Sequence, residues 1–204
     1  MKNEAHKESK KREKKSIGML FFNIIILILS LFIGSTVSES VICGEINASN
    51  QGSYVQGSAV ALDTPITLTF YVASINSDKL EGLLADISNP SSPNYGKYLS
   101  TEELLELTTN KVGQTAVTNY LKSLPATIND TGSDGNQISA TAPASLWQTA
   151  LNAVFYTYTN ADNNALIRTP SYSLPAEVCS VVSLVSPTTQ FPVAFHHGPV
   201  RTPS

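Results

Sequence analysis

Two prolines three residues apart, Pro90 and Pro93, prevent a regular helix from crossing the middle of this 204-residue chain. Gly96 follows shortly after and supplies a backbone position that tolerates a positive φ. Ser and Asn side chains between these residues favour turns. We therefore expect residues 90–97 to form a rigid, turning connection that any fold of this chain must accommodate.

The residues directly after that turn predict the beginning of a helix. If Ser100 is the N-cap, Glu103 falls at the third helical position, and the two residues complete a capping box. Leu99, before the cap, is placed to pack against Leu104 as a hydrophobic staple. The sequence thus predicts a turn that leads into a capped helix.

Hydrophobic periodicity predicts the elements around this segment. Apolar residues alternate along residues 66–72, which indicates a half-buried strand. They recur at helical spacing along residues 77–87, which indicates a helix that we expect to pack on the sheet. The helical stripe is Leu80, Leu83, Leu84 and Ile87, and the next helix has a predicted buried side of Val112, Val117, Tyr120, Leu121 and Leu124. A strand at 137–142, a helix around Trp147 and a hairpin of 154–159 with 165–169 complete the pattern. This order predicts an α+β domain with helices on one face of an antiparallel sheet.

The turn and the helix after it also resemble a family signature. Residues 88–107, SNPSSPNYGKYLSTEELLEL, are similar to the hallmark of the activation prodomain of the sedolisins, the serine-carboxyl peptidases that include kumamolisin and the lysosomal tripeptidyl peptidase. Residues 168–175 resemble the family's closing Arg-Thr-x-x-Tyr-x-x-Pro pattern. The matching positions are Pro90, Ser92, Pro93, Tyr95, Gly96, Tyr98, Leu99, Glu102, Glu103, Tyr172 and Pro175.

This resemblance covers residues 64–192 and implies a ferredoxin-like fold. It also implies a peptidase catalytic domain as partner. In that family the prodomain assists the folding of the catalytic domain and blocks its cleft until the protein reaches an acidic compartment. The family's catalytic serine, glutamate and aspartate lie in a later domain without a counterpart here. We therefore expect a truncated precursor that is not itself an enzyme. A stand-alone inhibitor with a prodomain fold and an unrelated secreted binding domain are the alternatives. The transcript beyond Ser204 would distinguish the truncated precursor from the stand-alone inhibitor.

The N-terminal region indicates entry into the secretory pathway. A basic run at residues 1–16 precedes residues 17–38, whose apolar part, 17–34, would reach about 27 Å as a helix. This segment is interpreted as a cleaved signal peptide or as a signal anchor, which would be the chain's only membrane contact. We expect a lysosomal or extracellular location, a linker at residues 39–63 and an irregular tail at residues 193–204.

Charge and cysteine content narrow the function classes. Residues 1–16 contain seven of the 13 Lys and Arg residues but only three of the 16 Asp and Glu residues. The rest of the chain therefore carries a net charge of −7. It lacks the basic stripe that binding to nucleic acid requires. Cys43 and Cys179 are candidates for one disulfide, although their spacing leaves the pairing open. Asn47 and Asn129 begin two glycosylation triplets.

No set of residues in the sequence predicts catalysis, a metal or a cofactor. A hydrolase needs a nucleophile with a base in reach and donors for the oxyanion, and no motif supplies them. His196 and His197 are neighbours in the tail, where adjacent side chains point apart, so they are interpreted as tail residues. Glu102, Glu103 and Glu106 are explained by their place at a helix N-terminus.

Overall fold

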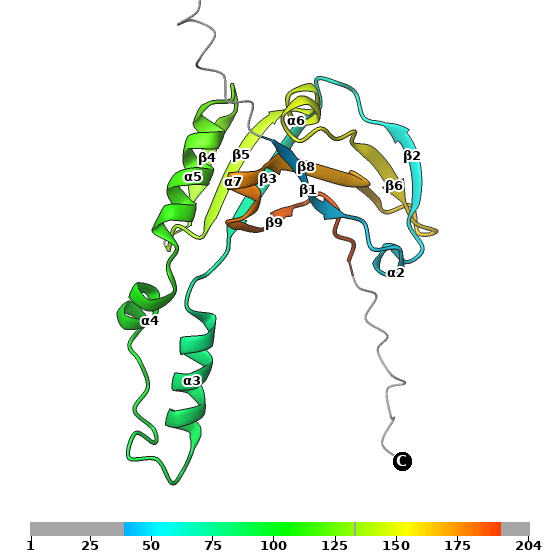
Figure 1. Ribbon diagram of the computed structural model, residues 1–204. Coiled ribbons are helices and arrows are strands. Elements are labelled where there is room, and N and C mark those ends of the chain that lie inside the picture. Colours follow the sequence, from blue (N-terminus) through cyan, green and yellow to red (C-terminus); the bar gives the residue numbers. More distant parts are fainter. Residues whose placement is uncertain (1–38, 133, 193–204) are drawn as a thin grey trace, which may run out of the picture. The chain divides into compact units, whose positions relative to one another are not determined.

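The computed structural model describes residues 39–132 and 134–192, and the expected signal segment and tail lie outside them. Figure 1 shows the order of the elements along the chain. They are β1 (Ser40–Glu45), α2 (Ala48–Gln51), β2 (Val55–Ala59), β3 (Pro65–Val72), α3 (Ser77–Ser88), α4 (Thr101–Thr108), α5 (Lys111–Lys122), β4 (Thr127–Thr131), β5 (Gln137–Pro143), α6 (Ala144–Ala150), β6 (Tyr156–Thr159), β7 (Ala165–Arg168), β8 (Ser171–Pro175), α7 (Ala176–Cys179) and β9 (Val182–Ser186).

The central feature is a four-stranded sheet in the order β4-β5-β3-β9. Every neighbouring pair in it is antiparallel. Numbered along the chain, its strands therefore lie in the order 2-3-1-4, with helices between the first and second and between the third and fourth. This is the ferredoxin-like arrangement, so the predicted α+β class is confirmed.

The core lies on one face of this sheet. Alternate residues of β3 are buried, namely Ile66, Leu68, Phe70 and Val72, as the alternation predicted. Their partners on α5 are Val117 and Leu121, and on α6 Trp147, all without exposed surface. The Trp147 indole Nε1 donates a hydrogen bond to the Ile66 carbonyl at 2.9 Å. Trp147 is a core residue, as predicted.

Two smaller sheets correct the prediction of a linker at residues 39–63. β1 pairs with β8, and β2 is the edge of a three-stranded sheet in the order β2-β6-β7. Every residue of β2 is exposed, so no alternation of apolar residues could mark it as a strand. These strands are held by backbone hydrogen bonds to distant segments, which leave no local pattern in the sequence.

The stripe on α3 does not pack on the sheet as expected. No residue of α3 is buried, and Leu84 is 56% exposed. α3 contacts α4, and the two helices extend away from the four-stranded sheet (Figure 1). Val112, also predicted to be buried, is 79% exposed because it lies on the side of α5 opposite Gly113, Val117 and Leu121, which are the buried residues of that helix.

Within the residues that the structure describes, no helix has the length and apolar character needed to cross a membrane.

Candidate partner-binding site

The predicted turn and helix start are both present. Gly96 has a φ of 74°, and its N–H donates to the Ile87 carbonyl at 2.9 Å, which closes the loop back onto the end of α3. The Ser100 N–H donates to Glu103 Oε2 at 2.8 Å, and the Glu103 N–H donates to Ser100 Oγ at 3.2 Å. The capping box is therefore confirmed. The Ser100 N–H and, at 2.9 Å, the Ser100 hydroxyl both donate to the Glu103 carboxylate, and these two bonds hold the pKa of Glu103 below its usual value.

Asp86 organises the same loop, and sequence reasoning missed it. Its two carboxylate oxygens accept hydrogen bonds from Ser92 Oγ at 2.5 Å and from Asn94 Nδ2 at 2.8 Å. These bonds, the Ser92 hydroxyl foremost, lower the pKa of Asp86. The available signal was a carboxylate two residues before the helix end, followed by Ser and Asn in a Pro-rich turn. Asp86 thus fixes the loop between α3 and α4.

Changing Asp86→Asn is expected to loosen this loop, because the amide keeps one acceptor oxygen where two are used. The pKa of Asp86 is lower in the folded chain than its usual value of 3.8. The ionised carboxylate therefore stabilises the folded loop fully above pH 3.8, and this stabilisation is lost as the pH falls through the lower folded-state pKa. NMR titration should therefore place the Asp86 midpoint below 3.8, and amide exchange at residues 92–97 should quicken in the variant at neutral pH. Glu81→Gln, at an exposed position of α3, is the control. An unshifted midpoint would contradict this role.

The signature residues fall into two groups in space. Pro90, Pro93, Tyr95, Tyr98 and Leu99 lie on the exposed loop with Gly96, and the two tyrosines are 57% and 75% exposed. Tyr172 is buried instead, where its hydroxyl accepts from the Val185 N–H at 3.2 Å. Pro175 is the N-cap of α7. The second group therefore stabilises the fold, and only the first is available to a partner.

The face of the four-stranded sheet opposite the core forms the second exposed feature, here called the open face. Its registered pairs include Thr67 with Thr141 and Thr69 with Ser139, whose hydroxyl oxygens lie 2.6 Å and 2.7 Å apart. By register the open face consists of Thr67, Thr69, Tyr71, Thr127, Asp130, Gln137, Ser139, Thr141, Leu184 and Ser186. Each of these residues is at least partly exposed, and they are mostly small and uncharged.

Comparison with known proteins identifies the family. Residues 53–191 match the model of the pro-kumamolisin activation domain. The chain belongs to this family.

Two probable tripeptidyl-peptidases and physarolisin are among the proteins similar to this activation domain. The probable tripeptidyl-peptidase SED4 of Trichophyton verrucosum is 31% identical over 149 residues, which is 72% of this chain and 25% of that protein. Its counterpart in Arthroderma benhamiae is 27% identical over 87% of this chain and 30% of its own length. Physarolisin of Physarum polycephalum is 32% identical over 62% of this chain and 22% of its own length. The chain therefore spans at most about a third of these relatives.

The activation domain contains one disulfide between the two cysteines that the sequence left unassigned. Cys43 on β1 and Cys179 on α7 are bonded, with Cα atoms 5.8 Å apart. The bond links the first strand to the C-terminal part of the domain, across 136 residues of sequence.

The two candidate glycosylation residues lie in different settings. Asn47 is the N-cap of α2, where its side chain accepts from the Ser49 N–H. Asn129 Nδ2 on β4 donates to Thr141 Oγ1 at 2.7 Å. The Asn129 nitrogen that would carry a glycan therefore lies beside a hydroxyl of the open face.

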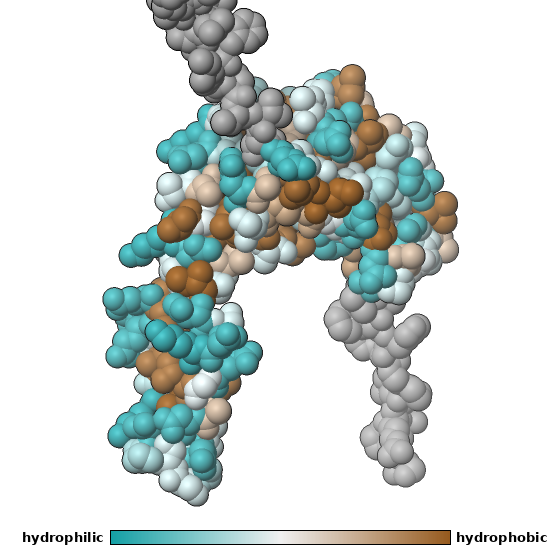
Figure 2. Space-filling view, in the orientation of Figure 1, coloured by the Kyte–Doolittle hydropathy of each residue, from teal (hydrophilic) through white to brown (hydrophobic). Residues whose placement is uncertain are grey.

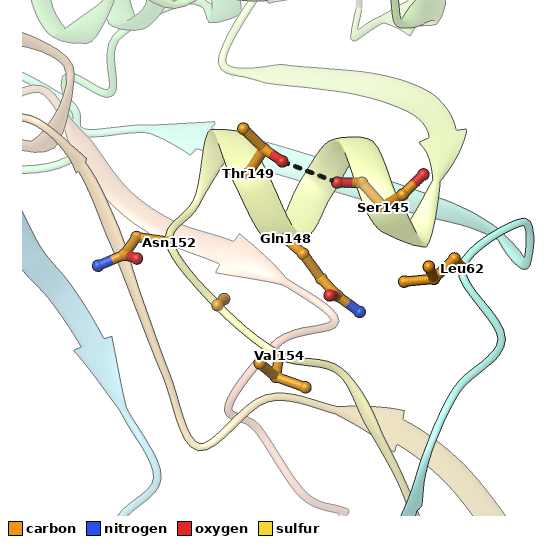
Figure 3. Close-up of a pocket in the computed structure, with 7 residues that line it drawn as sticks. Leu62, Ser145, Gln148, Thr149, Asn152 and Val154 are labelled. Atoms are coloured by element: carbon orange, nitrogen blue, oxygen red, sulfur yellow. Dashed lines mark hydrogen bonds between the residues drawn. The ribbon is translucent and has the colours of Figure 1, made fainter.

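The hollows of the activation domain offer little chemistry. One hollow of about 400 Å³ lies beside α6 (Figure 3). Its lining residues, Leu62, Ser145, Gln148, Thr149, Asn152, Ala153 and Val154, carry no charge. The Thr149 hydroxyl donates to the Ser145 carbonyl within the helix and has no neighbouring base. Across residues 39–132 and 134–192, no group of three or more His, Cys, Asp or Glu residues is placed to hold a metal ion.

Proposed function

We propose that this chain acts as the activation prodomain of a tripeptidyl-peptidase-like serine-carboxyl peptidase. It binds the catalytic domain, assists its folding and blocks its cleft, and it cleaves no peptide bond itself. The match over residues 53–191 and the relatives' names support the kind of partner. The main structural observation behind the proposal is the open face, because it is a broad exposed surface on the rigid central sheet to which the catalytic domain can bind.

The chemistry of the open face suits protein binding. Its hydroxyl side chains are paired with one another across the strands, so a partner need not break strong hydration of charged groups to cover them. The central strands β3 and β5 pair from Pro65 with Pro143 to Tyr71 with Gln137 without a break in register, so little conformational entropy is lost on docking. Depletion of charge at the centre of a surface is typical of the core of an interface.

The compartment follows from the same proposal. Disulfides persist in oxidising environments, so the Cys43–Cys179 bond supports passage through the secretory pathway to a lysosomal or extracellular destination.

Changing Thr67→Arg together with Thr141→Arg is expected to raise the inhibition constant at least 100-fold. The two guanidinium groups would be buried without partners at the interface, at a cost of several kcal/mol. The measurement is inhibition, by the secreted chain, of the probable tripeptidyl-peptidase SED4 of Trichophyton verrucosum, prepared without the region that this chain matches. Thr115→Arg, at an exposed position of α5, is the matched control. Failure of the unaltered chain to inhibit, or full inhibition by the double variant, would contradict the proposal.

Acid is expected to release the inhibitor in the same assay. Beyond residue 16 the chain carries 13 acidic and six basic residues, and its carboxylates lose attraction for a basic partner when they are protonated near pH 4. Inhibition should therefore weaken between neutral pH and about pH 4. Equal inhibition at both values would refute this trigger while leaving the binding surface in place.

A further inference from the structure

We infer that the loop between α3 and α4 is a second contact with the same catalytic domain, separate from the open face. This inference rests on the proposed function and assigns it an additional recognition element. The α3–α4 hairpin is defined here as residues 77–108, and its tip loop as residues 89–99. Tyr95 and Tyr98 are the proposed anchors.

The tip loop presents apolar surface that nothing in the described part of the chain covers. Tyr95 is 57% exposed and Tyr98 is 75% exposed, and the adjacent Leu99 is partly exposed as well. Figure 2 shows apolar residues interspersed with polar ones over the hairpin. Tyrosine is enriched among the residues that dominate binding energy, because a large rigid ring with a polar end fits a partner's pocket at low entropic cost.

The tip loop is also held in one conformation. The Gly96 N–H bonds to Ile87, and Asp86 receives the Ser92 and Asn94 side chains. The capping box then fixes the beginning of α4. Because the helices of this hairpin have no buried residues, ordering the tip loop adds little to its stability. A loop that binds a partner gains affinity from the same ordering, because pre-organisation removes the entropy cost of docking.

Charge defines the partner's surface. Residues 77–108 contain two lysines and six carboxylates, a net charge of −4. The acidic residues are Asp78, Glu81, Asp86, Glu102, Glu103 and Glu106. Two exposed tyrosines on a hairpin of net negative charge fit a partner that offers apolar pockets together with Lys or Arg.

The occupant is inferred from the relatives. The chain matches 30%, 25% and 22% of the length of three of them, so most of each relative lies outside the matched region. No residue of α3 or α4 is buried, although the hairpin carries several leucines. We therefore assign the hairpin to the peptidase domain that the proposed function already requires. Two contacts on one partner strengthen binding beyond either alone.

The test uses the same secreted chain and the same SED4 tripeptidyl-peptidase, with affinity measured directly. Tyr95→Ala together with Tyr98→Ala should weaken binding at least 30-fold, as expected for removal of dominant anchors. Val112→Ala, an exposed apolar position outside the hairpin, should leave the affinity within threefold of the unaltered chain. Asp86→Ala, which keeps both tyrosines, should weaken binding mainly through slower association.

The outcomes separate the two proposals. If the tyrosine variant binds as tightly as the unaltered chain while the open-face arginine variant does not bind, the tip loop is not a contact and the proposed function stands. If the unaltered chain does not bind, the proposed function itself fails. If the chain is a dimer that the tyrosine variant converts to a monomer without loss of peptidase affinity, the tip loop serves self-association and the inference is overturned.

Discussion

Replacing Trp147 with alanine is expected to lower the free energy of unfolding by about 3 to 5 kcal/mol, the range found for large aromatic residues removed from a core. Trp147 has no exposed surface, and its ring centroid lies 6.1 Å from that of Phe70. The substitution would also leave the Ile66 carbonyl, which accepts the indole N–H, without that donor inside the core. Two costs therefore combine at one site.

Chemical denaturation of the chain measures this effect. Val112→Ala is the control, since a 79% exposed side chain should change stability by less than about 0.5 kcal/mol. Trp147→Phe helps to separate the two costs, because it removes the donor completely but retains part of the ring volume. A Trp147→Ala variant as stable as the control would mean that α6 does not close the core as described.

The fold was predictable wherever one element carries its own pattern. The alternation on β3 gave the inner strand of the sheet, and Ser100 with Glu103 gave the start of α4 to the residue. β1, β2 and β4 were missed, because edge strands with polar or exposed residues have no alternation to detect. α3 was predicted correctly as a helix but with the wrong partner, because periodicity identifies an apolar stripe and not what covers it.

The candidate site was predictable in part for a similar reason. Pro90, Pro93 and Gly96 marked the tip loop, but their backbone role did not reveal that Asp86 holds it. The open face was not recognised as a surface, because the hydroxyl residues of β3 and β5 become neighbours only when strands 70 residues apart pair. Surfaces formed across strands depend on register, which local sequence does not specify.

Changing both Cys43 and Cys179 to serine is expected to lower the free energy of unfolding by about 2 to 5 kcal/mol. The disulfide closes a loop of 136 residues, for which chain entropy alone gives about 5 kcal/mol as an upper value. Thermal or chemical denaturation measures the loss. The chain contains only these two cysteines, so a reducing agent should bring the unaltered chain to the stability of the double variant and leave the variant unchanged.

The residues at which amide exchange increases show whether the Cys43–Cys179 disulfide stabilises the whole domain or one strand. β1 is held to the domain by its pairing with β8 and by Cys43, and its residues are only partly buried or exposed. If the disulfide stabilises the whole domain, amide exchange in β3 and β5 should quicken together with that in β1. If exchange rises only at residues 40–45 and the unfolding midpoint stays fixed, the bond merely fastens one strand, and the expected global loss is wrong. The former result would make the activation domain's stability dependent on an oxidising compartment, because reduction would then weaken the sheet that forms the open face.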